Sequence, residues 1–175
     1  MAKNINMFLF YFYKFFGGGK IFRSYMKKIL WCLFFTYCLL LAEILLVGRE
    51  PNLLLSVKDY FVLNANVIPF KTLIRYASFF AARRDWESFL LAFYNIGGNF
   101  FLFFPMGFFL PVLFAKMRKR LLYLLFVFCL VLSAELLQGV FCAGVPDIDD
   151  LIVNLFGSYI GFLLSKKFIF RRALS

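Results

Sequence analysis

Residues Leu132–Gly161 read LSAELLQGVFCAGVPDIDDLIVNLFGSYIG, two apolar segments joined by a short acidic connection. The first segment contains Glu135 and Gln138, and the acidic run Asp147–Asp150 opens the second. An ionisable side chain at the centre of a membrane helix costs about 3 kcal/mol on insertion scales. These side chains therefore indicate either a functional site or a specific contact between helices. We interpret the rest of the chain as the frame for this hairpin.

The composition is that of an integral membrane protein. Of the 175 residues, 63% are hydrophobic and 28 are Phe, and the mean hydropathy is +0.84, whereas soluble domains contain about 45–50% apolar residues. The sequence contains no histidine, which removes the usual neutral-pH general base and the commonest transition-metal ligand. Any chemistry must therefore use carboxylates, amides or the backbone.

The placement of the basic residues predicts the orientation of the chain. The 20 Lys and Arg residues give a net charge of +11, but they flank apolar segments, as topology signals and lipid contacts do, and no nucleic-acid partner is expected. The loop at 116–120 and both chain ends are basic, whereas residues 141–150 contain no Lys or Arg. We therefore predict that both termini are cytoplasmic and that the acidic hairpin lies outside.

Four apolar segments are long enough to cross a bilayer, which requires about 20 helical residues. They predict an all-α membrane protein with spans at about 29–48, 89–115, 121–140 and 151–170, within one transmembrane domain of residues 29–170. Residues 1–28 form a basic, aromatic-rich cytoplasmic segment and residues 171–175 a cytoplasmic tail. The long connection between the first two spans is expected outside, with short apolar pieces on the membrane surface. We expect a multi-pass membrane protein.

Polar and helix-breaking residues interrupt the second predicted span. Asn95 and Asn99 occur there beside Gly97 and Gly98, and Pro105 follows. Because proline removes a helical hydrogen bond, we expect a kink at Pro105. Backbone groups freed at membrane depth need partners, so this helix is expected inside the bundle.

The fourth predicted span presents a polar and small-residue face. Asp150, Asn154, Gly157 and Gly161 are spaced 4, 3 and 4 residues apart and therefore lie on one side of a helix. The two glycines allow another helix to approach closely. The third span is the simplest partner, because only a short connection separates it from the fourth.

The buried polar residues of the spans share the outer part of the membrane. At 1.5 Å per residue, Glu135 and Asn154 lie roughly 6–7 Å below the outer surface. Such groups also serve as contacts between helices, each worth on the order of 1 kcal/mol, and aspartates at a helix start also act as caps. Alongside these structural interpretations, we predict a ligand-binding cluster with no assigned catalytic residue. Its members are Glu135, Gln138, Asp147, Asp149, Asp150, Asn154, Asn95 and Asn99.

Several motifs carry a family resemblance. The hairpin has the form S-x-E-x-x-Q followed by D-I-D-D-L-I-x-N-x-x-G-x-x-x-G, an N-x-x-P-F element occurs at Asn66–Phe70, and F-P-M-G-F occurs at 104–108. Together these motifs resemble the VanZ family of small polytopic membrane proteins, named for a teicoplanin resistance protein. The resemblance implies a protein of the bacterial plasma membrane with a role in glycopeptide resistance. Many members carry an Arg shortly before D-I-D-D, where this chain has Gly144–Pro146, and this missing cation weakens the inference of a phosphate contact.

Two functions of different class remain open. The favoured one is a non-enzymatic membrane protein whose outward polar pocket engages a lipid-linked envelope molecule, such as a peptidoglycan precursor or a lipoglycopeptide. The alternative is an intramembrane enzyme that uses Glu135 and the aspartates as acid, base or Mg²⁺ ligands on a lipid-linked phosphate or glycan. Membrane lipids are expected partners in either case. The sequence leaves the cofactor, the metal and a homo-oligomeric state undetermined.

Overall fold

The computed structural model describes residues 20–47 and 54–173, and within them the side chains of residues 24–45 and 54–167. Most of the predicted segment 1–28 and the last two residues of the predicted tail lie outside the described residues. The chain forms two compact units, residues 1–37 and residues 38–175.

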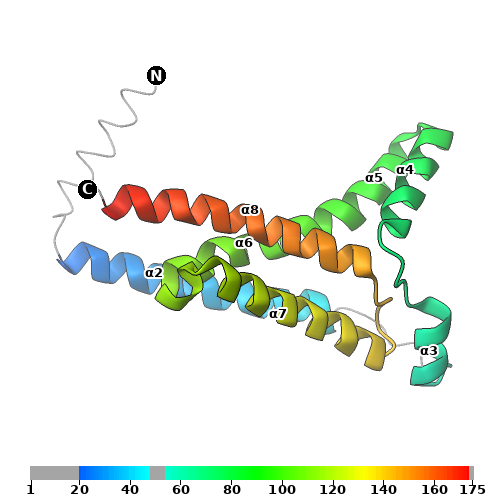
Figure 1. Cartoon of the computed structure of the whole chain (residues 1–175), viewed down its shortest axis with the longest axis horizontal. Helices are drawn as coiled ribbons and strands as arrows, with labels where there is room; N and C mark the ends of the chain where they lie inside the picture. The colour runs from blue at the N-terminus through cyan, green and yellow to red at the C-terminus, as the bar shows by residue number, and fades with distance from the viewer. Residues whose placement is uncertain (1–19, 48–53, 174–175) are drawn as a thin grey trace. The chain divides into compact units, whose positions relative to one another are not determined.

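The described residues are helical almost throughout and contain no strand, apart from an isolated bridge between Asn66 and Asp147. Figure 1 shows the helices in chain order. They are α2 (Lys20–Ala42), η1 (Glu43–Val47), α3 (Val57–Asn64), α4 (Lys71–Arg83), α5 (Trp86–Ala92), η2 (Phe93–Gly97), α6 (Gly98–Leu113), η3 (Ala115–Arg118), α7 (Arg120–Val140) and α8 (Ile148–Ala173).

Among the described residues, four helical segments are long and apolar enough to cross a membrane. They are Ser24–Leu45, Trp86–Leu113, Arg120–Val140 and Ile148–Lys167. The predicted all-α class with four membrane helices is therefore confirmed. The second segment begins earlier than predicted because α5, the π-helical turn η2 and α6 follow one another without a break. The orientation of the chain and its division into domains stay predictions.

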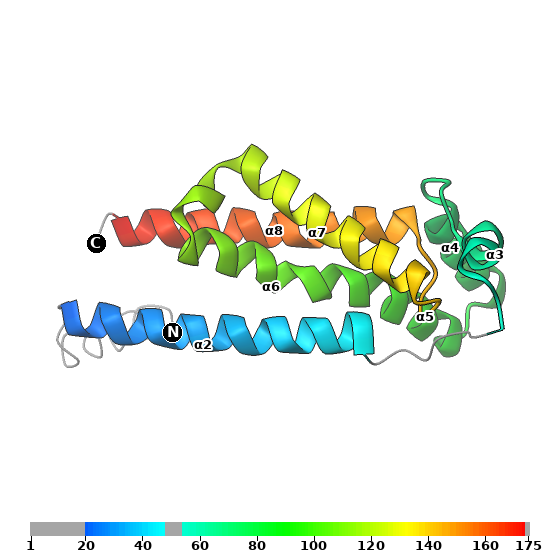
Figure 2. The same ribbon diagram turned by 90° about the horizontal axis from the view of Figure 1, so that it is seen from below.

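The glycine face of α8 packs against α6, and not against α7 as expected. A Cβ atom at Gly157 would collide with the carbonyl oxygen of Phe100, and one at Gly161 with that of Phe104. Gly161 follows Gly157 by four residues, and Phe104 follows Phe100 by four, so the two helices run in the same direction. They lie side by side in Figures 1 and 2. The prediction that α7 covers the glycines of α8 was wrong because α6 supplies a matching glycine, Gly107. A Cβ atom added at Gly107 would collide with the backbone of α8. Close helix contact requires small residues on the facing surfaces.

Helix α7 packs on α8 through one face, with its residues buried at positions 123, 127, 131, 135 and 138. The ring of Tyr123 stacks on that of Phe162 with 4.4 Å between centroids. Its hydroxyl donates to the carbonyl oxygen of Ser158 at 3.0 Å. At the other end of α7, Glu135 contacts the start of α8. The two helices are therefore antiparallel.

The connection before the second span contains α3 and α4. Ser56 caps α3 by accepting the N–H of Asp59, and Asp85 caps α5 by accepting the N–H of Ser88. Helix α4 packs against α5. It starts after Phe70, which has a positive φ of 65° and offers no capping side chain. The cap of α4 must therefore come from elsewhere in the chain.

Candidate functional site

The missing cap of α4 is supplied by Asp149 from the acidic hairpin. One carboxylate oxygen of Asp149 accepts the backbone N–H of Phe70, and the other accepts those of Thr72 at 2.7 Å and Leu73 at 3.2 Å. Asp149 is only 1% exposed. A buried carboxylate that accepts several N–H groups at a helix start satisfies those donors and suits the positive end of the helix dipole. Asp149 therefore fixes the place where α4 begins.

Asp147 joins the same two segments through its side chain. Its Oδ1 accepts the Nδ2–H of Asn66 at 2.8 Å, and its Oδ2 accepts the hydroxyl of Thr72 at 2.6 Å. The Oδ1 atom also accepts the N–H of Asp149 at 2.8 Å, which is the capping role that the sequence suggested for the start of α8. Asp147 is thus both a cap of its own helix and a contact to the α4 segment.

The main chain reinforces this junction. The N–H of Asn66 donates to the carbonyl oxygen of Pro146 at 2.9 Å, and the N–H of Ile148 donates to that of Asn66 at 3.0 Å. The N-x-x-P-F element and the D-I-D-D element, far apart in the sequence, therefore form one structural unit.

Glu135 and Gln138 support the junction from α7. A carboxylate oxygen of Glu135 accepts the N–H of Asp147 at 3.2 Å, and the amide of Gln138 donates to the carbonyl oxygen of Leu45 at 3.1 Å. Both side chains are buried, at 8% and 3% exposure. Their observed contacts hold α7 to the acidic hairpin and to η1.

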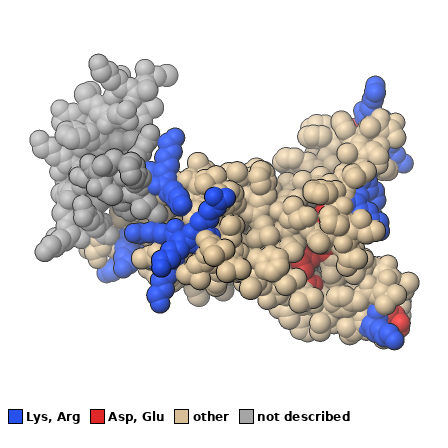
Figure 3. Space-filling view, viewed as in Figure 1, with Lys and Arg blue, Asp and Glu red and all other residues tan. Residues whose placement is uncertain are grey.

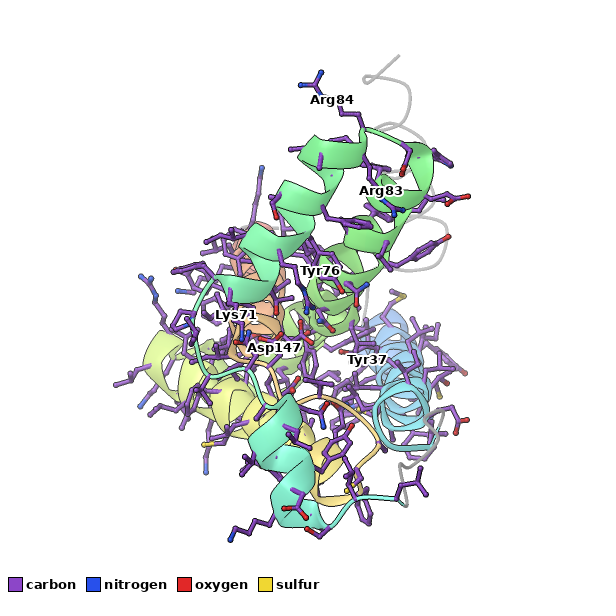
Figure 4. All side chains as sticks on the ribbon, turned by 90° about the vertical axis from the view of Figure 1, so that its right-hand side faces the viewer. Tyr37, Lys71, Tyr76, Arg83, Arg84 and Asp147 are labelled. Carbon is purple, nitrogen blue, oxygen red and sulfur yellow. The ribbon has the colours of Figure 1, made fainter. Side chains whose placement is uncertain are left out.

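A cavity of about 790 Å³ lies between α4, the η2–α6 segment and the beginning of α8. Its charged and amide lining includes Lys71, Arg75, Asn95, Asn99, Asp147 and Asp150. Figure 3 shows a small acidic patch surrounded by uncharged surface near where α8 begins in Figure 1, and basic side chains apart from it toward α4. In Figure 4, Lys71 and Asp147 lie close together at the start of α4.

The π-helical turn η2 contributes directly to this cavity. It contains Asn95, whose Nδ2 donates to the carbonyl oxygen of Leu91 at 2.8 Å. This bond uses one of the two N–H donors of the amide, and the same side chain carries an oxygen that can accept a hydrogen bond. Single π-helical turns often mark functional positions in helices. Gly98, which follows η2, lines the cavity, and a Cβ atom there would meet open space.

The structure divides the predicted binding residues into two groups. Asn95, Asn99, Asp147 and Asp150 line the cavity. Glu135, Gln138, Asp149 and Asn154 do not line it and are buried. Within the described part of the chain, the Oδ1 atom of Asn154 has no hydrogen-bond partner, although a buried acceptor left unpaired costs about 1–3 kcal/mol. The described residues contain no cluster of three or more His, Cys, Asp or Glu arranged to hold a metal ion.

Sequence reasoning missed the basic side chains of the cavity. Lys71 and Arg75 come from α4, a short helix in the connection that was assigned to the membrane surface. A usable signal was present: the two residues are four positions apart, so they share a helix face, and they follow the N-x-x-P-F element directly. They bring positive charge to the site although the chain has no Arg immediately before D-I-D-D.

Comparison with known proteins identifies a family. The sequence profile described as VanZ/LLP1 matches residues 34–171, which include the cavity, the N-x-x-P-F element and the acidic hairpin. No curated protein and no solved structure matched the chain. The match covers most of the sequence and agrees with the four apolar helices that the structure contains. The chain therefore belongs to the VanZ/LLP1 family.

Proposed function

We propose that this protein is a non-enzymatic membrane protein whose cavity binds the polar head of a lipid-linked envelope molecule on the outer side of the bacterial plasma membrane. The observation that carries the proposal is the cavity of about 790 Å³ with its charged and amide lining. Ligand sites in proteins have volumes of about 300–1,000 Å³ and use a few placed polar groups for specificity. The size fits a headgroup with part of its attached chain.

The position of the cavity supports a ligand anchored in lipid. Three of the elements that line it, η2, α6 and α8, belong to membrane-spanning segments, and α4 belongs to the connection before the second span. A polar cavity where spans meet a connection suits a molecule whose head is polar and whose tail is apolar. The basic loop at 116–120 lies at the opposite end of α6 and α7. Under the positive-inside rule that loop is cytoplasmic, which puts the cavity outside.

Binding is preferred to catalysis because of how the aspartates are used. Asp149 accepts three backbone N–H groups, and Asp147 accepts bonds on both carboxylate oxygens. Carboxylates that hold two segments together in this way serve the architecture first. Asp150, Asn95 and Asn99 are further polar residues from the spans that line the cavity, and side chains of these types recognise ligands by hydrogen bonding.

Family membership suggests the biological setting. The motifs of this chain resemble a family named for a teicoplanin resistance protein, and a lipid-linked peptidoglycan precursor is one envelope molecule of the proposed kind. We therefore propose that occupancy of the cavity, by such a precursor or by the lipid-bearing drug itself, contributes to resistance against teicoplanin-like agents.

Gly98 offers a direct test, because a side chain there enters the cavity without a backbone collision. We expect Gly98→Leu to fold normally, to lose co-purifying envelope lipid in mass spectra and to abolish any teicoplanin protection in cells expressing it. Gly98→Ala, with a single added carbon, is the matched control and should keep both properties. Full protection and unchanged lipid content in Gly98→Leu would contradict the proposal.

A further inference from the structure

Resting on the proposed function, we infer that the cavity takes a phosphoester whose head also carries hydroxyl or amino groups, with the phosphate bound by Lys71 and Arg75. The cavity lining combines two cationic side chains from α4 with carboxylates from the start of α8, and these groups set the chemistry of the ligand.

Helix α4 supplies the positive charge. Lys71 and Arg75 both line the cavity and lie four residues apart on α4, so their Cβ atoms are about 5–6 Å apart on one helix face. An ammonium group and a guanidinium fork at this spacing can bind different oxygens of one phosphate, the guanidinium through two parallel hydrogen bonds. Both side chains are exposed to the cavity side and to solvent, which leaves a ligand room to reach them.

The start of α4 is itself not the anion site. Helix N-termini often bind phosphate through their unpaired N–H groups, but here the N–H groups of Phe70, Thr72 and Leu73 donate to Asp149. A phosphate must therefore be held by side chains. Because Asp149 fixes where α4 begins, it also fixes the position of Lys71 at the first residue of the helix.

The remaining polar lining includes two carboxylates, those of Asp147 and Asp150. Asn95 adds an amide whose oxygen is an acceptor and whose nitrogen donates to the carbonyl oxygen of Leu91. A ligand that carried only phosphate oxygens would meet repulsion from these carboxylates. A ligand with hydroxyl or amino groups next to its phosphate would donate hydrogen bonds to them. A trimethylammonium headgroup has phosphate but no such donor, so it should bind poorly.

The inference is tested by native mass spectrometry of the purified full chain in detergent with an equimolar mixture of short-chain phosphatidylglycerol, phosphatidylethanolamine and phosphatidylcholine. We expect the first two to bind at least about fivefold better than phosphatidylcholine, a difference of about 1 kcal/mol. In a second arm, thermal stability is measured with soluble glycerol 1-phosphate and with phosphocholine. If glycerol 1-phosphate stabilises the protein as much as phosphatidylglycerol does, the ligand source is a free phosphoester. If only phosphatidylglycerol stabilises it, the ligand is a membrane lipid.

Helix α4 also provides a matched control for charge. Lys71→Gln combined with Arg75→Gln should lower binding of phosphatidylglycerol about tenfold or more, since two charge-assisted bonds are lost. Arg83→Gln combined with Arg84→Gln removes the same charge from the far end of α4, outside the cavity (Figure 4). Binding of phosphatidylglycerol by this second double variant should stay within about twofold of that by the wild type.

The outcomes separate the two proposals. Equal binding of all three lipids would overturn the phosphoester inference. An equal loss of phosphatidylglycerol binding in the two double variants of α4 would overturn it as well. If Gly98→Leu abolishes lipid binding while Lys71→Gln with Arg75→Gln leaves it intact, the cavity binds lipid without a phosphate contact and only the inference fails. If lipid binding survives in Gly98→Leu, the proposed function fails as well.

Discussion

At the scale of single residues, Asp149 is the side chain on which the site depends. Replacing it with Asn keeps the size but removes the charge, and the NH2 group of Asn must then face either the N–H of Phe70 or those of Thr72 and Leu73. We expect Asp149→Asn to lower the free energy of unfolding by about 2–3 kcal/mol, since bonds to a buried charged acceptor are lost. Hydrogen exchange at the amides of Thr72 and Leu73 should accelerate, and thermal unfolding in detergent should report the loss.

A second aspartate provides the control for that substitution. Asp59 lies in the first turn of α3, is exposed and accepts the hydroxyl of Ser56 at 2.6 Å. Asp59→Asn should change the free energy of unfolding by no more than about 0.5 kcal/mol, as surface substitutions do. Unchanged exchange at the start of α4 in Asp149→Asn would show that the helix does not need this cap.

At the scale of elements, two glycines should respond oppositely to the same substitution. Alanine favours a helix over glycine by about 1 kcal/mol. At Gly98, where an added Cβ meets open space, Gly98→Ala should leave the stability unchanged or raise it. At Gly157 the added carbon meets the backbone of Phe100, so Gly157→Ala should cost about 1–3 kcal/mol by forcing α6 and α8 apart. Melting temperatures of both variants in the same detergent check the prediction, and a stabilised Gly157→Ala would refute the close packing.

The elements also show where sequence reasoning succeeds. Apolar runs of about 20 residues predict membrane helices because the bilayer sets that length, and the four helices were predicted this way. Periodicity placed Gly157 and Gly161 on one face of α8 correctly. It did not reveal that α6 covers this face, because helix pairing depends on complementary surfaces from two helices and not on the length of the loop between neighbours.

At the scale of the whole molecule, the site is an association of distant segments. The aspartates were recognised from the sequence, since acidic residues beside apolar segments are unusual. The role of Asp149 as the cap of α4 was not, because Asp149 and Thr72 are 77 residues apart and no local pattern encodes such a contact. The same contact brings Lys71 and Arg75 to the cavity. The basic half of the lining therefore became visible only in the folded chain.

The orientation of the molecule decides whether the cavity can meet an outer ligand. With the four native cysteines replaced by alanine, single cysteines are introduced as Ser78→Cys on exposed α4 or Lys119→Cys in the basic loop. We expect a membrane-impermeant maleimide to label Ser78→Cys in cells with a sealed plasma membrane, and Lys119→Cys only after permeabilisation, because the positive-inside rule places the loop in the cytoplasm. The reverse pattern would place the cavity in the cytoplasm, where peptidoglycan precursors on the outer membrane face cannot reach it.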